Sequence, residues 1–217
     1  RTIRRLIGGL VAERAAAMAA DNRLVLDYII EEVLARQDVA TVDFLLRTAH
    51  LDQLCGRLCD AVTGRDDGAG TLERLERANL LLVPLDDQRE WYRFHRLFAQ
   101  LLRIHGRGLA AEVHLAATGW YRDEGLLAEA LEHAVAVPDF PAIRAPVWEL
   151  GSRMLHIGEV QAVRRSLAGL SAVVAESSLE VCVLQAWACV LGRPAKDPAR
   201  WLGLAAAAAG ADPGNRL

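Results

Sequence analysis

Hydrophobic residues recur at helical spacing over the first part of the chain. Asp21 and Asn22 are both good N-cap residues. After them, apolar residues recur at helical spacing with acidic residues on the opposite face, which predicts an amphipathic helix that ends near Gln37. A second helix is expected after a cap at Asp38, and a third over residues 51–64. The predicted buried stripe of the second helix is Val42, Leu45, Leu46 and Ala49.

The pattern changes near residue 80. A glycine and aspartate cluster at 64–70 predicts a loop, and Thr71 is expected to cap a short helix after it. An apolar run at 80–85 and an alternating aromatic run at 91–94 are separated by five polar residues, which predicts a β-hairpin. His95 then opens a helix, whose predicted buried stripe is Leu97, Phe98, Leu101 and Leu102. Helices, a hairpin and a further helix indicate a winged-helix-like unit, with the hairpin as its wing.

From residue 108 onward the pattern is purely helical and it repeats. The expected pairs are 110–124 with 126–137, 141–156 with 159–170, and 178–192 with a helix from residue 197. Glycines end the first helix of each pair, and their spacing is 33 residues from 125 to 158 and 34 residues from 158 to 192. This period is typical of tetratricopeptide-type helical hairpins.

The predicted fold is therefore mainly α: a winged-helix-like unit with a short β-hairpin, followed by tetratricopeptide-like helical repeats. The expected organisation is an N-terminal helical segment at 1–37, the winged-helix-like domain at 38–107, the repeats at 108–209 and a linker or tail at 210–217. Within the first pair, Ala130 and Ala134 are expected to pack opposite Trp120 and Tyr121.

Charge and hydropathy narrow the range of functions. The 217 residues carry a net charge of −3, so nothing attracts the chain as a whole to nucleic acid or to anionic lipid. The helix before the wing, at 72–77, has two glutamates against two arginines and is expected to pack against protein rather than DNA. No apolar run reaches the roughly 18 residues of a membrane span, and we expect a cytoplasmic protein without membrane contact.

No motif for catalysis or for phosphate binding is present, so we expect no catalytic residue and no enzyme. Asp86 and Asp87 are interpreted as a solvated hairpin turn. His50, Cys55 and Cys59 are too few and wrongly spaced for a zinc site, so no metal is expected and the cysteines are interpreted as small buried thiols.

Two aromatic features have more than one interpretation. His133 follows Glu129 by four positions, and it is either a hydrogen-bonded core residue or the exposed half of a pair. The tryptophans of the repeats are expected to fill the inter-helix core rather than to form a stacking platform. They are Trp120, Trp148, Trp187 and Trp201.

Several blocks together resemble the MalT-like, large ATP-binding LuxR-type transcription regulators of the STAND class of signal-transduction ATPases. The blocks stand at 27–34 (DYIIEEVL), 44–48 (FLLRT), 58–64 (LCDAVTG), 75–80 (LERANL), 91–102 (WYRFHRLFAQLL) and 120–134 (WYRDEGLLAEALEHA). The resemblance implies an N-terminal nucleotide-binding domain, a winged helix, repeats that sense an effector, and a C-terminal helix-turn-helix that binds DNA. This chain resembles the middle of that arrangement.

The resemblance therefore implies that ATP or ADP is bound in the full-length protein by a domain absent here, and that this segment alone binds none. It implies three kinds of contact: the nucleotide-binding domain of the same protein, an effector small molecule or regulatory protein on the repeats, and DNA through an absent C-terminal domain. The expected function is to relay nucleotide state and to bind the effector or partner. The alternatives are a stand-alone helical-repeat adaptor and the middle module of a kinase-linked regulator.

One residue acquires a role from the resemblance. In the related switches, a histidine at the start of the last winged-helix helix contacts the β-phosphate of bound ADP and holds the closed state. His95 stands at that position, although Arg96 follows it where the wider class commonly has an acidic residue. An imidazole beside the N–H groups of a helix start suits a phosphate. The alternative is a histidine that caps its own helix.

Overall fold

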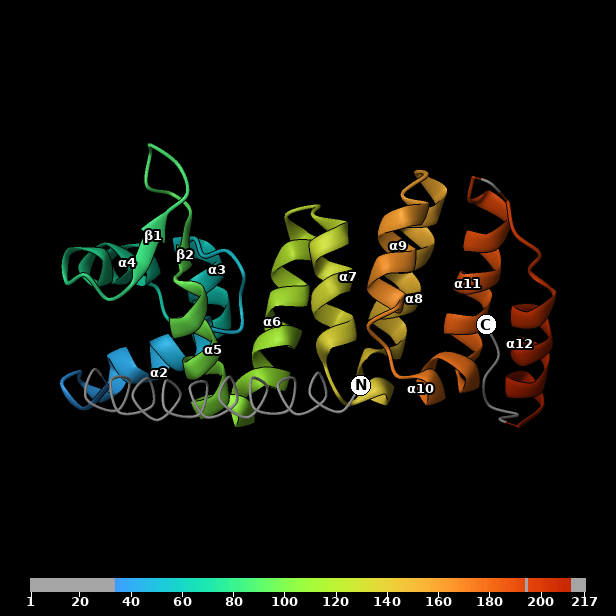
Figure 1. Ribbon diagram of the computed structural model, residues 1–217, viewed down its shortest axis with the longest axis horizontal. Helices are drawn as coiled ribbons and strands as arrows, with labels where there is room; N and C mark the ends of the chain where they lie inside the picture. The colour runs from blue at the N-terminus through green and yellow to red at the C-terminus, as the bar shows by residue number, and fades with distance from the viewer. Residues whose placement is uncertain (1–33, 194, 212–217) are drawn as a thin grey trace, which may run out of the picture. The chain divides into compact units, whose positions relative to one another are not determined.

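The computed structural model describes residues 34–193 and 195–211 (Figure 1). Nearly all of the predicted helical segment at 1–37, with the helix that follows Asp21, and most of the tail at 210–217 lie outside the described residues. The chain divides into two compact units. The first contains the described residues up to Cys59 and 66–107, and the second contains 60–65 and 108–211.

The first part of the chain has the element order of a winged helix. Its elements are α2 (Val39–Thr48), α3 (Gly56–Thr63), α4 (Gly68–Arg77), β1 (Leu82–Pro84), β2 (Tyr92–Phe94) and α5 (Arg96–His105). The strands pair antiparallel with Leu82 opposite Phe94 and Pro84 opposite Tyr92. Pro84 stands at the end of its strand, where a missing N–H is tolerated. The predicted hairpin and its flanking helices are confirmed.

Helix α2 begins where the sequence indicates, but the face that it buries differs from the predicted one. Asp38 caps it, since its Oδ1 accepts a hydrogen bond of 2.9 Å from the backbone N–H of Thr41. The fully buried face consists of Phe44, Leu45, Thr48 and Ala49. The predicted stripe was therefore right for Leu45 and Ala49 and wrong for Val42 and Leu46, which are only partly buried. Thr48 is tolerated inside because its hydroxyl donates to the Phe44 carbonyl over 2.6 Å.

The third helix begins later than expected, because the preceding segment extends the sheet. The N–H of Leu54 donates to the carbonyl of Tyr92, and the N–H of Tyr92 donates to the carbonyl of Leu54, each over 2.8 Å. Strand β2 therefore has hydrogen-bonded neighbours on both sides. The prediction of a helix from residue 51 is wrong, and α3 starts only at Gly56.

Helix α4 begins earlier than expected, at Gly68 instead of after Thr71. Its first turn packs closely on the start of α3. A Cβ added to Gly56 would lie 2.7 Å from the Cβ of Ala69 and 2.9 Å from its backbone nitrogen. Thr71 lies inside the helix and is buried, and its hydroxyl donates to Asp67 over 3.2 Å. The glycines at 68 and 70 therefore belong to the helix and not to a loop.

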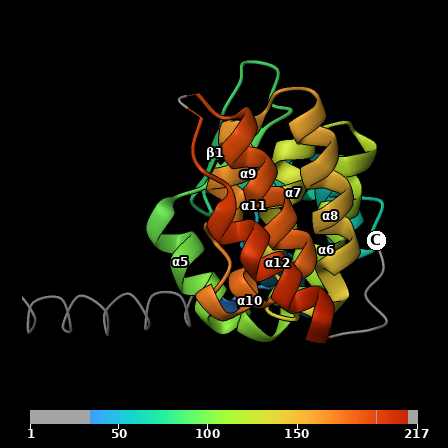
Figure 2. The same ribbon diagram turned by 90° about the vertical axis from the view of Figure 1, so that its right-hand side faces the viewer.

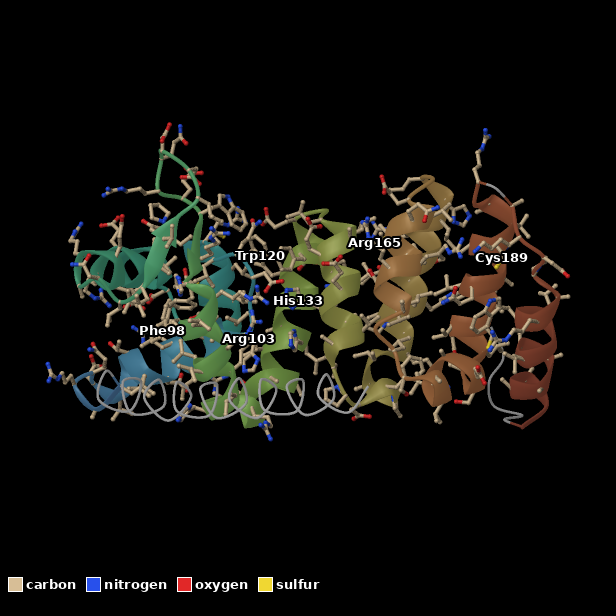
Figure 3. The ribbon with its side chains drawn as sticks, viewed as in Figure 1. Phe98, Arg103, Trp120, His133, Arg165 and Cys189 are labelled. Atoms are coloured by element: carbon tan, nitrogen blue, oxygen red, sulfur yellow. The ribbon has the colours of Figure 1, made fainter. Side chains whose placement is uncertain are left out.

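Helix α5 buries Phe98, Ala99, Leu101 and Leu102. Leu97 was expected in the stripe, but it is 48% exposed, and Ala99 takes the buried position. Phe98, labelled in Figure 3, packs edge-on against Phe94 of β2 with ring centroids 5.7 Å apart. The helix is thereby fixed to the wing.

The second part of the chain consists of successive helices, and its longer helices run side by side (Figures 1 and 2). After the short 3-10 turn η1 (Arg107–Leu109), these are α6 (Ala110–Asp123), α7 (Leu127–Ala136), α8 (Phe140–His156), α9 (Val160–Leu167), α10 (Ala172–Ser177), α11 (Leu179–Leu191) and α12 (Ala199–Ala211). Helices α6 and α7, α8 and α9, and α11 and α12 are in contact as pairs. The predicted helical repeats are confirmed, whereas α10 was not foreseen.

Two of the three periodic glycines end a helix with the same turn. Gly125 and Gly158 have φ of 78° and 90°, the left-handed conformation that favours glycine. In each turn the next residue donates its N–H to the carbonyl five residues earlier, Leu126 to Tyr121 and Glu159 to Met154, which closes a Schellman motif. Gly192 has φ of −66° and is followed by a longer connection to α12. The third glycine of the period therefore stands in a different turn.

Small residues meet large ones where α6 packs on α7. Ala130 and Ala134 are fully buried, and Tyr121 is nearly so.

The described part of the chain contains no helix long and apolar enough to cross a membrane.

Candidate functional site

A cavity of about 640 Å³ lies in the first unit, beside the start of α5. Three segments form it: the connection between α2 and α3, the wing, and one side of α5 from its first turn to its last. The polar side chains that line it include Asp52, Arg93, His95, Arg96 and Arg103. Its volume falls within the usual range for small-molecule sites.

His95 is positioned by its backbone. It is the N-cap residue of α5, and its N–H donates to the carbonyl of Leu81 over 2.7 Å, so the wing holds it in place. Its side chain is exposed and makes no capping hydrogen bond. The alternative interpretation, a histidine that caps its own helix through the imidazole, therefore does not describe this position. The imidazole lines the cavity instead.

The charge of the cavity is predominantly positive. Arg103, labelled in Figure 3, donates from Nε to the Ala49 carbonyl and from Nη2 to Asp52 Oδ1 over 2.9 Å. Among the residues that the structure describes, neither Arg93 nor Arg96 has an ion-pair partner. Asp52 is the one acid among the described lining residues, and Arg103 already neutralises it. The cavity is thus suited to an anion such as a phosphate group.

His50 contacts the C-terminal end of α5, where Gly106 is the C-cap residue. Its Nε2–H donates to the carbonyl of Gly106 over 3.0 Å. Burial, and then the positive charge of Arg103, hold the pKa of His50 below its usual value of 6.5. Within residues 34–193 and 195–211, no group of three or more His, Cys, Asp or Glu side chains is arranged to hold a metal ion. Cys59, Cys182 and Cys189 are buried thiols, and Cys55 is partly buried.

The helix before the wing has its charges paired. Arg74 lies 3.5 Å from Asp67, and Arg77 lies 2.7 Å from Glu73. Phosphates of DNA would have to compete with these carboxylates for both arginines of α4. At the wing tip, the two carboxylate oxygens of Asp86 accept from the N–H groups of Glu90 and Trp91, each over 2.9 Å. Asp86 therefore stabilises the hairpin turn.

The repeats contain a pair of histidines. His114 and His133 approach to 2.8 Å between their Nδ1 atoms, and His133 stacks on Tyr121 with ring centroids 5.2 Å apart. Both histidines are partly buried, and Figure 3 labels His133 on α7. Of the two interpretations of His133, the hydrogen-bonded inner residue agrees with the structure. None of the four tryptophans of the repeats is fully buried. Trp201 nevertheless packs against the core between α11 and α12, as expected, whereas Trp187 is 39% exposed.

The sequence indicated His95 but not the residues around it. Arg93 could have been found, because it is the outward-facing residue between the buried Tyr92 and Phe94. Asp52 and Arg103 could not, because they are 51 residues apart and only the fold joins them.

Comparisons with known proteins give a consistent result. Residues 30–113 match the family model of the MalT winged helix domain. The chain is 35% identical over 181 residues to the HTH-type transcriptional regulator MalT of Yersinia pestis (strain Pestoides F), a match that covers 81% of this chain and 20% of that protein. It is 33% identical over 180 residues to the HTH-type transcriptional regulator MalT of Klebsiella pneumoniae subsp. pneumoniae, with the same coverage. The chain thus spans about a fifth of the length of these curated relatives.

Proposed function

Because this chain carries a winged helix domain of the MalT family and is a MalT-like region over most of its length, we propose that it is the regulatory and interaction segment of an ATP-dependent transcription regulator of the LuxR type. The relatives are transcriptional regulators by name, which supports a role in transcription regulation. The regulator would act in the cytoplasm. It would bind DNA through another domain, which agrees with the paired charges of α4.

The winged helix relays the state of a nucleotide bound by a neighbouring domain of the same protein. The observation that supports this role is the cationic cavity beside α5, where His95 stands near Arg93 and Arg96, two arginines that have no ion-pair partner among the described residues. A diphosphate bound by the neighbouring domain would place negative charge against this cavity. Such a contact favours the closed state while ADP is present, and its loss shifts the population toward the open state.

The repeats provide the second half of the function. Stacked helical pairs form an extended surface for a partner, and each pair contacts only its neighbours. In this proposal the repeats bind an effector molecule or a regulatory protein. The winged helix then couples that event to the nucleotide-binding domain.

His95→Ala in the full-length regulator tests the first half of the function. The substitution is expected to weaken ADP binding and to raise transcription in the absence of inducer, because the closed state loses a contact. The melting temperature is expected to stay unchanged, since the exposed imidazole makes no capping hydrogen bond.

His105→Ala is the matched control. This histidine is exposed on the same helix, hydrogen-bonds to the Leu101 carbonyl over 2.9 Å and does not line the cavity. It is expected to leave ADP affinity unchanged. Unchanged ADP affinity in His95→Ala would eliminate the nucleotide-sensing role.

A further inference from the structure

An aromatic group joins α8 to α11 in the repeats. The rings of Trp148 and Trp187 stack with centroids 6.4 Å apart at 23°, and His156 meets Trp187 edge-on at 5.4 Å. Trp187 is 39% exposed and Trp148 is partly buried. Water therefore reaches an aromatic surface that a folding core would have covered.

A cavity of about 580 Å³ adjoins this aromatic group. It lies between the α8–α9 turn and the end of α11, and His156 belongs to both the aromatic group and the cavity lining. Leu191, one turn after Trp187 on α11, continues the apolar wall. Its polar lining comes from Glu159, Gln161 and Arg193. The cavity thus has an apolar side, where His156 borders the aromatic group, and a polar side.

Two guanidinium groups lie at the polar side, and neither forms an ion pair with Glu159 or with any other acid that the structure describes. Arg193 lines the cavity, and Nη1 of Arg164 lies 3.6 Å from the place that a Cβ on the lining residue Gly192 would occupy. Arg164 is partly buried, and neither guanidinium group has a hydrogen bond or an ion pair with the residues that the structure describes. Partial burial of a charge without a partner is unfavourable, because the charge loses solvation and gains nothing. An anion bound here would reverse that cost.

We propose that this cavity binds a small organic carboxylate that carries an apolar or aromatic ring. The ring lies against Trp187 and His156, and the carboxylate receives hydrogen bonds from Arg164 and Arg193. This inference rests on the proposed effector-binding role of the repeats, for which it supplies a place and a ligand chemistry.

The composition of the lining selects this chemistry. A planar carboxylate matches the planar fork of a guanidinium and accepts two parallel hydrogen bonds from it. A neutral ring compound would fill the aromatic side and leave the arginines unpaired. A small anion without a ring would leave the aromatic surface in water. A carboxylate attached to a ring satisfies both sides of the cavity.

Phenylacetate is a suitable probe for the chain of 217 residues. The five tryptophans give five indole N–H cross-peaks in a 15N-correlated NMR spectrum, and Trp187→Phe identifies the one from Trp187. Titration with phenylacetate is expected to shift that cross-peak saturably, with a Kd of about 1 mM or lower. Phenylacetamide, the neutral analogue, and acetate, the anion without a ring, are each expected to bind at least about tenfold more weakly.

Arginine variants locate the anion. Arg164→Gln and Arg193→Gln are each expected to weaken phenylacetate binding about tenfold. Arg193 is exposed, so its variant keeps the fold and provides a second reading if Arg164→Gln does not fold. The control is Arg165→Gln, because Arg165, labelled in Figure 3, neighbours Arg164 on α9, is exposed and does not line the cavity. It is expected to bind phenylacetate as the unchanged chain does.

Three results would overturn the inference: no saturable shift of the Trp187 cross-peak, equal binding of phenylacetate and phenylacetamide, or an equal loss in the Arg164 and Arg165 variants. These results concern the repeats alone. ADP affinity and transcription in His95→Ala are measured on the full-length regulator and report on the winged helix, so a failure of the carboxylate site and a failure of the nucleotide relay are distinguishable.

Discussion

At the scale of single residues, His50 makes stability depend on pH. Its folded-state pKa is lowered, first by burial and then by the charge of Arg103, so the folded state favours the neutral imidazole. This contribution to stability is fully present above pH 6.5, the usual pKa, and is lost as the pH falls toward the lower folded-state value. We expect His50→Gln, whose amide can still donate to the Gly106 carbonyl, to lose less stability than the unchanged chain between pH 7.5 and 5.5 in urea unfolding. Equal losses would show that His50 does not titrate in this range.

Single residues also show where sequence reasoning ends. The place of His95 at the start of α5 follows from the pattern alone, and so does the cap at Asp38. The exact face that each helix buries does not follow. Thr48 is polar yet buried, because it donates to its own helix, and Leu97 is apolar yet exposed, because α5 presents a neighbouring alanine to the core. Helical spacing defines a stripe only to within about one position.

At the scale of elements, close packing between α3 and α4 leaves no room for a side chain at Gly56. Gly56→Ala would drive a Cβ into the backbone of Ala69, and a rigid contact of this kind costs about 1–3 kcal/mol. Gly119→Ala is the matched control, because Gly119 lies inside α6 with open space around its Cα. That change is expected to stabilise the chain by about 0.5–1 kcal/mol through helix propensity. Urea unfolding of both variants measures the difference, and a Gly56→Ala chain as stable as the original would refute the packing argument.

Elements were predictable wherever a local signal determines them. Glycines in the left-handed conformation end α6 and α8, and the sequence shows both. The start of α3 was not predictable, because residues before Gly56 pair with β2, a partner 38 residues away between Leu54 and Tyr92. The start of α4 was missed because glycines usually indicate a loop, whereas Gly68 and Gly70 lie inside the first turn of this helix.

At the scale of the whole molecule, charge predicts how the chain treats DNA. Its net charge is −3, and both arginines of α4 have carboxylate partners. We expect no sequence-specific binding in fluorescence anisotropy with an operator duplex and a scrambled duplex, at both low and moderate salt. A preference for the operator that weakens steeply with salt would contradict this expectation.

The hydrogen bonds between Leu54 and Tyr92 join the wing directly to the connection between α2 and α3. The wing tip is braced by Asp86, and its second strand is bonded on one edge to β1 and on the other to the chain between α2 and α3. A displacement at the tip is therefore carried to that connection, which also contributes Asp52 to the cationic cavity. Both hydrogen bonds join backbone groups, so a change of side chain at Leu54 or Tyr92 leaves them in place. Only a proline at one of these positions removes an N–H donor.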